Sequence, residues 1–262
     1  MRNQIYLGSI ALEKNRWVAG RMPTYLVSDY LEQIKKDGFA GIELWENHYM
    51  KAGSAERKKL AGAEIDFIFN SYLSLKDGIT DEIREIAAAI RDLSAKAVKF
   101  NYSLRDFDWN PGYTEEDYIT QTDNLLRFAE LVPGMKLLCE CHANTLMEHP
   151  QRAGEVFARL DERFGAIVHL SDGREHLEAC FDCYGDRIRH IHTANAVEGI
   201  GFDYLESADI RMRDNYELMV SRGFAGTLTI EFVKNAADAQ GYYTAAQRDL
   251  KYLIKLTEEA EG

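Results

Sequence analysis

Short apolar runs and amphipathic segments alternate along almost the whole chain. The apolar runs are rich in β-branched and aromatic residues and predict strands at residues 5–11, 41–46, 66–73, 97–103, 136–142, 166–171, 188–194 and 227–233. Between them, apolar residues at helical spacing predict helices at 28–37, 81–93, 115–131, 150–163, 175–184, 210–222 and 244–259. The connection over 51–62 has the weakest helical pattern. Thr80 and Thr114, the latter followed by Asp117, are the expected N-caps of two helices.

This alternation sets the fold class. Strand and helix alternating about eight times in some 260 residues is the length and rhythm of a (β/α)8 TIM barrel. A doubly wound open sheet is the alternative, but no strand-to-helix turn carries a glycine-rich phosphate loop such as G-x-G-x-x-G. No linker-like stretch interrupts the pattern. We therefore expect an α/β protein with one barrel domain over residues 1–262.

Alternation within each strand predicts which side chains enter the barrel. Side chains of a barrel strand point in turn to the surrounding helices and to the interior. In residues 227–233, Leu228, Ile230 and Phe232 should face the helices, which turns Glu231 inward. The same rule turns further side chains inward near the carboxyl ends of their strands: Glu43, Trp45, Lys99, Asn101, Glu140, His142, His169, His190 and His192.

So many ionisable groups require partners or a cation, because an unpaired buried charge costs several kcal/mol. Glu140, His169, His192 and Glu231 end the last four predicted strands, so they should meet at the mouth of the barrel. Two carboxylates with two imidazoles suit one divalent metal, such as Mn, Co, Mg or Zn. The alternative is a polar core without metal. Lys99 is expected either as a counter-ion for Glu43 or Glu140 or as a catalytic residue.

Composition and charge argue against several classes of function. The hydrophobic fraction of 46% and charged fraction of 28% are those of a globular protein. A net charge of −12 without a basic block argues against binding to nucleic acid. With no apolar run of about 18 residues and no signal-peptide pattern, we expect a soluble, cytoplasmic protein without membrane contact. The four cysteines are expected as buried thiols, with a zinc knuckle or redox pair as the alternative: Cys139, Cys141, Cys180 and Cys183.

Several of these motifs together resemble the xylose isomerase-like barrel superfamily, the sugar-phosphate isomerase/epimerase group often labelled AP endonuclease family 2. The motifs are Gly38-Phe-Ala-Gly-Ile-Glu-Leu44, Leu138-Cys-Glu-Cys-His142, Arg187-Ile-Arg-His-Ile-His192 and Thr229-Ile-Glu-Phe232. The resemblance implies metal ligands at Glu140, His192 and Glu231. On the sixth strand the family usually reads Gly-x-x-x-Asp-x-x-His, whereas here His169 precedes Asp172. We expect His169 as the ligand and Asp172 near substrate, with an Asp172 ligand left open.

The expected activity is that of a metal-dependent isomerase or epimerase acting on a small sugar or keto-polyol. Glu140 and Glu231 would transfer a proton through a metal-stabilised enediolate, with His142 or Lys99 as an acid. Further substrate contacts are expected from Glu43, Trp45, His48, Asn101, Asp172 and Trp17, and Trp109 is another candidate for stacking on a sugar. The main alternative is a lyase or dehydratase acting on a keto-sugar or inosose. An AP endonuclease or a non-catalytic sugar-binding subunit is less favoured, and a homo-oligomer is left open.

Overall fold

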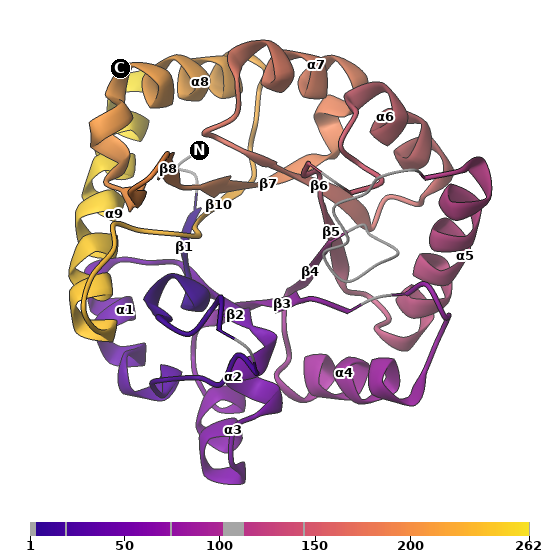
Figure 1. The fold of residues 1–262 in the computed structure, drawn as a ribbon, viewed down its shortest axis with the longest axis horizontal. Coiled ribbons are helices and arrows are strands. Elements are labelled where there is room, and N and C mark those ends of the chain that lie inside the picture. The colour runs from indigo at the N-terminus through magenta and orange to yellow at the C-terminus, as the bar shows by residue number, and fades with distance from the viewer. Residues whose placement is uncertain (1–3, 19, 74, 102–112, 144, 262) are drawn as a thin grey trace.

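The predicted barrel is confirmed. The computed structural model describes residues 4–18, 20–73, 75–101, 113–143 and 145–261 (Figure 1). Parallel strands close into a barrel in the order β1-β10-β7-β6-β5-β4-β3-β2. They are β1 (Gln4–Gly8), β2 (Gly41–Trp45), β3 (Asp66–Ser71), β4 (Ala97–Asn101), β5 (Lys136–Glu140), β6 (Phe164–His169), β7 (Ile188–Thr193) and β10 (Thr227–Ile230).

Helices form a ring around this barrel (Figure 1). They are α1 (Leu31–Asp37), α2 (Glu46–Met50), α3 (Ser54–Ala61), α4 (Asp81–Asp92), α5 (Glu115–Leu131), α6 (Pro150–Arg159), α7 (Arg174–Tyr184), α8 (Asp209–Ser221) and α9 (Ala239–Glu261). Both expected caps are present: Thr80 accepts from the Ile83 N–H, and Thr114 forms a capping box with Asp117. Within the described residues, no helix is long and apolar enough to span a membrane.

Apolar side chains fill two separate layers. The larger layer lies between strands and helices, and the smaller one lies inside the barrel: Tyr6, Ile68, Ala97, Leu138 and Ile167. In β4, β5 and β6, a polar inward residue follows two positions after the inner-layer residue: Lys99, Glu140 and His169, respectively. Because the amino-terminal part of the interior is packed with apolar groups, the polar side chains gather at the carboxyl end of the strands.

A β-hairpin was absent from the sequence-based prediction. β8 (Asn195–Val197) and β9 (Gly201–Asp203) pair as an antiparallel hairpin just after β7. Gly199 turns the hairpin with φ of 73°, a left-handed conformation that favours glycine. The hairpin also contributes to the surroundings of Phe232, whose ring stacks on that of Phe202 just beyond the end of β10.

The cysteines are free thiols. Cys139, Cys141 and Cys180 are buried, and Cys183 is half-buried. In the described part of the chain, the groups of side chains that could share a metal ion contain no cysteine. Burial raises the pKa of Cys180 to about 11, as expected of an inert structural thiol.

Candidate metal centre at the mouth of the barrel

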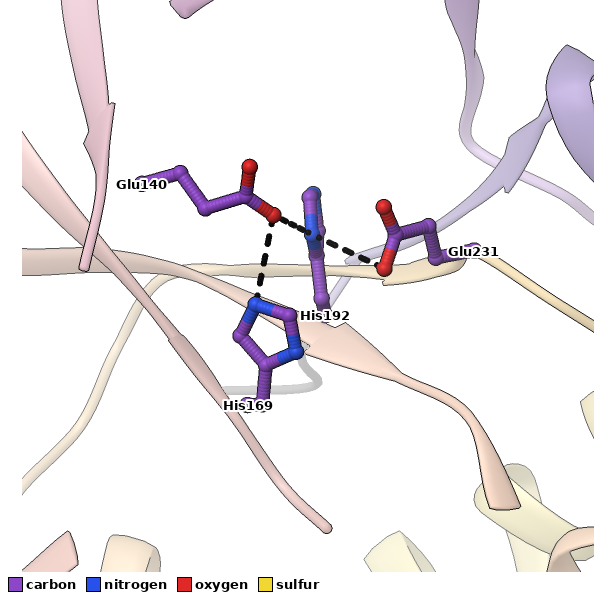
Figure 2. Close-up of side chains that lie close together, drawn as sticks. All are labelled: Glu140, His169, His192 and Glu231. Atoms are coloured by element: carbon purple, nitrogen blue, oxygen red, sulfur yellow. Dashed lines mark hydrogen bonds and ion pairs between the residues drawn. The ribbon is translucent and has the colours of Figure 1, made fainter. Parts of the chain in front are cut away.

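Four side chains from four different strands converge at the mouth, and we call them the quartet: Glu140, His169, His192 and Glu231 (Figure 2). Glu140 and His169 end β5 and β6, His192 is the last residue but one of β7, and Glu231 follows β10. One potential ligand atom from each lies within 4.8 Å of those of the others. The barrel closure therefore assembles the residues that the strand alternation predicted to meet.

Direct contacts link the members of the quartet. Glu140 Oε1 lies 3.2 Å from His169 Nε2 and 3.1 Å from His192 Nδ1. His192 Nδ1 also lies 3.3 Å from Glu231 Oε2. Ligands about 2.1 Å from one ion are separated by about 3.0–3.4 Å, so these spacings match those of groups that share a metal. The His169 side chain is 17% exposed, whereas that of His192 is fully buried, so the quartet opens toward His169.

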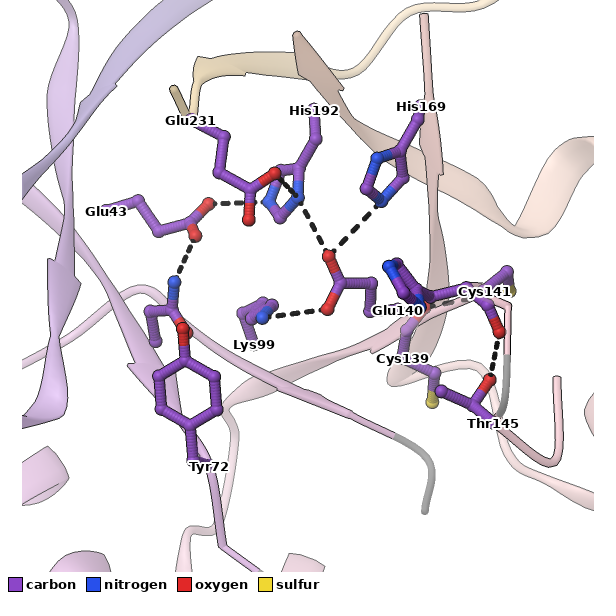
Figure 3. Close-up of polar contacts among 12 residues, drawn as sticks. Glu43, Tyr72, Lys99, Cys139, Glu140, Cys141, Thr145, His169, His192 and Glu231 are labelled. Atoms are coloured by element: carbon purple, nitrogen blue, oxygen red, sulfur yellow. Dashed lines mark hydrogen bonds and ion pairs between the residues drawn. The ribbon is translucent and has the colours of Figure 1, made fainter. Parts of the chain in front are cut away.

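Glu43 orients His192 from behind the quartet. Its Oε2 lies 3.0 Å from His192 Nε2 (Figure 3). The same oxygen lies 3.2 Å from His190 Nε2, and Oε1 accepts from Asn70 Nδ2 at 2.7 Å. Burial alone would raise the pKa of Glu43, but the imidazoles of His192 and His190 have the larger opposite effect. The net pKa is lowered, so the carboxylate is ionised. An ionised carboxylate only accepts, so His192 Nε2 carries a proton and Nδ1 faces the quartet.

Lys99 pairs with Glu140 from within the barrel. Its Nζ lies 2.8 Å from Glu140 Oε2, and both side chains are buried (Figure 3). Burial opposes the charge of Lys99, but the carboxylate of Glu140 outweighs this and raises the pKa of the amine. Burial likewise opposes the charge of Glu140, and Lys99 with the neighbouring imidazoles holds its pKa well below the usual range. Both groups are therefore charged.

Tyr72, to which the sequence analysis assigned no role, borders the site together with Arg21. The ring of Tyr72 lies 5.2 Å from Lys99 Nζ and 4.4 Å from the guanidinium of Arg21, which also lies 5.4 Å from the ring of Trp45. Burial raises the pKa of Tyr72 to about 12 against the opposing effect of Lys99 and Arg21, so the phenol stays protonated. The alternation of β3 contained the signal, because Asn70 and Tyr72 share the inward parity.

A pocket of about 350 Å³ adjoins the quartet through His169. Its other lining residues are Cys141, His142, Ala143, Glu148, His149, Asp172 and His176. The rings of His142 and His169 are 5.7 Å apart, and Asp172 Oδ2 lies 4.0 Å from His176 Nε2. His142 and Asp172 are thus brought beside the quartet. The grouping of four potential ligands includes His169 rather than Asp172.

Other predicted site residues are not members of the quartet. His48 is buried, with Nε2 3.0 Å from Glu13 Oε1 and Nδ1 2.9 Å from Ser9 Oγ. Trp45 is fully buried, and Trp17 is 63% exposed at the rim. The roles of these three residues in substrate binding stay predictions.

Two further candidates are only partly described. Asn101 ends β4 and pairs in register with Glu140, but its side chain lies outside the described part of the structure. Trp109 lies outside the described residues altogether. Their predicted contacts with substrate stay predictions.

Comparisons by sequence find no relative, whereas comparisons by structure find many. No family model and no curated protein matches the sequence. D-allulose 3-epimerase from Methylomonas sp., in complex with D-allulose, matches with a TM-score of 0.73 and 12% identity over 97% of both chains. A xylose isomerase-like TIM barrel protein from Mycobacterium smegmatis, in complex with magnesium, matches with a TM-score of 0.65 and 11% identity, covering 99% of this chain and 98% of that one. The IOLI protein with a bound zinc atom matches at 0.64 and 14%, covering 98% and 97%.

These identities are too low to transfer an activity, but they establish the architecture. The chain has the fold of the xylose isomerase-like TIM barrel proteins, as its motifs predicted. One fold of this kind supports many reactions, so function must be argued from the site.

Proposed function

We propose that the protein is a divalent-metal-dependent isomerase or epimerase acting on a sugar or keto-polyol. The observation that carries this proposal is the quartet, in which two carboxylates and two imidazoles from four strand ends share a space of 4.8 Å. Such a site at the mouth of a barrel is where enzymes of this architecture keep their chemistry. The structural likeness to a D-allulose 3-epimerase supports the same class of reaction.

The donor set suits a divalent ion such as Mn, Co, Mg or Zn. Glu140, His169, His192 and Glu231 would hold it, each through one atom of the quartet. When bound there, the ion would stabilise negative charge on two adjacent substrate oxygens while a carbon-bound proton is removed. Glu43 would keep His192 Nδ1 directed at the ion, because it fixes the proton on Nε2.

The two carboxylates of the quartet differ in a way that suggests their roles. Within the described residues, Glu231 has an ion pair only through Oε2, so its Oε1 is the oxygen available to take a proton from substrate. Glu140 Oε2 instead accepts from the ammonium group of Lys99. We assign proton removal to Glu231 and proton return to Glu140, with Lys99 resupplying Glu140. Return to the other face gives epimerisation, and return to the neighbouring carbon gives isomerisation.

The pocket beside His169 would hold the rest of the reacting sugar. Its volume of about 350 Å³ is in the range of small-ligand sites. Asp172, Glu148 and the pocket histidines offer hydrogen-bonding groups that match the hydroxyls of a polyol. His142 and Asp172 are therefore assigned to substrate orientation.

Proton exchange with solvent tests this proposal directly. Protein loaded with Mn would be incubated in D₂O with D-allulose, D-fructose and other ketoses, and deuterium at the carbon beside the carbonyl would be followed by NMR. We expect exchange by the native protein and a loss of at least about 100-fold in Glu231→Gln. Glu198→Gln removes the same charge on an exposed turn and should exchange normally.

Three results would contradict the proposal. Exchange that persists unchanged in Glu231→Gln would remove that residue from the proton transfer. Release of water or of a leaving group in step with exchange would assign the protein to the lyases instead. No exchange with any ketose, by protein that retains its metal, would also exclude the isomerase reaction.

A further inference from the structure

Three aromatic rings form a continuous surface at the rim of the barrel, and we call them the aromatic shelf: Trp17, Phe202 and Phe232. Phe202 and Phe232 are stacked, with centroids 4.6 Å apart and an interplanar angle of 25°. The ring of Trp17 lies 5.6 Å from that of Phe232. The shelf joins three segments that are distant in sequence: the loop after β1, the β8–β9 hairpin and the segment after β10.

The shelf lies next to the quartet but outside the barrel wall. Phe232 directly follows Glu231, and the strand alternation sends the two side chains to opposite faces. The shelf therefore adjoins the reacting centre along the chain. A ring stacked on it would not be the one whose carbon meets Glu231.

Arg16 makes the shelf rigid. Its guanidinium is buried and lies 5.2 Å from the ring of Phe232 and 5.6 Å from that of Phe202. Its Nη1 donates to the Glu13 carbonyl at 2.9 Å. The carboxylate of Glu13 in turn accepts from the Thr24 N–H at 2.7 Å, which ties the loop that carries Trp17 to itself. Rings that are fixed before binding lose little conformational entropy when a ligand arrives.

The exposure of Trp17 is what requires an explanation. A side chain of this size is usually well buried, yet Trp17 is 63% exposed while its neighbours Phe202 and Phe232 are half-buried. Charged groups flank the shelf, since Lys234 Nζ lies 2.8 Å from Asp203 Oδ1 beside Phe202. An aromatic face edged by charged side chains complements a sugar ring, which has apolar C–H faces and hydroxyls around its edge.

From this arrangement we infer that the substrate is a glycoside, whose second sugar ring stacks on Trp17 while the reacting ring occupies the quartet. This inference rests on the proposed function for the reacting ring. The second ring lies beside Phe232, on the outer side of Glu231. Trp17 is then a specificity residue for the attached ring, and Arg16 is a positioning residue.

Binding rather than turnover tests the inference. Mn-loaded protein would be titrated by calorimetry with glucose and with its disaccharides maltose, cellobiose and trehalose. At least one disaccharide should bind about tenfold or more tightly than glucose. In Trp17→Ala this preference should fall to within about twofold, while affinity for glucose is unchanged. Trp17→Tyr should keep most of the preference. Ile210→Ala, which removes another highly exposed apolar side chain, should keep all of it.

Three results would overturn the inference. The native protein could bind no disaccharide more tightly than glucose. The preference could survive in Trp17→Ala. Trp17→Ala could also alter the molar mass in solution and leave sugar affinity alone, which would make the shelf an interface between copies of the chain. A disaccharide preference that depends on Trp17, without proton exchange, would uphold this inference and count against the proposed reaction alone.

Discussion

Glu43 shows how one residue can govern a metal site that it does not enter. Its carboxylate fixes the proton of His192 on Nε2, which leaves Nδ1 directed at Glu140 and Glu231. It also accepts from Asn70, so its own orientation is fixed. Partners of this kind commonly change metal affinity by about 10- to 100-fold.

We therefore predict that Glu43→Gln weakens metal binding by about 10- to 100-fold without removing a ligand. The amide can donate as well as accept, so it no longer dictates the tautomer of His192. Competition with a chromophoric chelator would measure the change, and Glu198→Gln is the control for charge. Equal affinity in Glu43→Gln and the native protein would show that Glu43 has no part in orienting His192.

Lys99 is the second residue whose effect on the site can be measured by itself, through the charge that it supplies to Glu140. It neutralises Glu140 in a buried pair, and removing one member of such a pair typically costs about 3–5 kcal/mol. We predict that Lys99→Met lowers the free energy of unfolding of the metal-free protein by this amount. With Mn present the decrease should be smaller, because the ion supplies the missing positive charge. Urea unfolding with and without Mn would check this. Equal losses in both conditions would argue against an ion at Glu140.

The residues predicted from sequence were those that strand parity can assign. Glu140, His192 and Glu231 alternate with apolar neighbours, so their direction follows from the strand alone. His48 could not be placed in this way. Its environment depends on Glu13, which the chain brings to it from 35 positions earlier.

At the scale of elements, the rhythm of strands and helices was predictable but several boundaries were not. The first strand was expected over residues 5–11, yet β1 ends at Gly8 and the apolar residues that follow form a 3-10 helix, Ser9–Leu12. These residues are buried in both conformations, so their hydrophobic pattern does not distinguish them. The carboxyl end of a helix was also overextended, since α6 ends at Arg159 rather than at residue 163.

The last helix was predicted too short for a different reason. It was expected over residues 244–259, but α9 begins at Ala239. Gly241 has a low intrinsic preference for helix, which favoured a later start. In the structure its N–H donates to the side chain of Asp238 at 2.9 Å, and Asp238 acts as an N-cap. A capping contact outweighs the intrinsic cost of one glycine.

Asp249 links α9 to the segment after the hairpin and makes this junction sensitive to pH. Its Oδ1 accepts from the Leu205 N–H at 3.0 Å, whereas its buried Oδ2 has no partner within the described residues. Burial raises the pKa of Asp249 to about 7. The folded state therefore favours the protonated acid. The stability that this group contributes is complete below pH 4 and is lost as the pH rises to about 7.

We predict that Asp249→Asn is more stable than the native protein at pH 8 and that this advantage shrinks toward pH 4. The amide resembles the protonated acid and does not ionise. A pKa raised from 3.8 to about 7 bounds the change in the stability difference between the two proteins at about 4 kcal/mol. Thermal or urea unfolding across this range would measure it, with Asp123→Asn on the exposed face of α5 as the control. A difference that does not vary with pH would mean that Asp249 ionises normally in the fold.

At the scale of the whole molecule, the closed barrel is what creates the centre. Each member of the quartet comes from a different strand, and the strands that carry them are neighbours in the order β10-β7-β6-β5. None of the four residues lies near the others in sequence, so only the closure of the sheet brings their atoms within 4.8 Å. The fold and the quartet are therefore coupled, and an ion bound there would stabilise the folded state.

The measurement that tests the account most directly is the number of metal ions retained per chain. Protein reconstituted separately with Mn, Co and Zn would be freed of loosely held ions and subjected to elemental analysis. We predict about one ion per chain in the native protein, and its loss in Glu140→Gln and in His192→Ala. No retained ion in the native protein, or full retention in both variants, would contradict the metal centre and the reaction proposed for it.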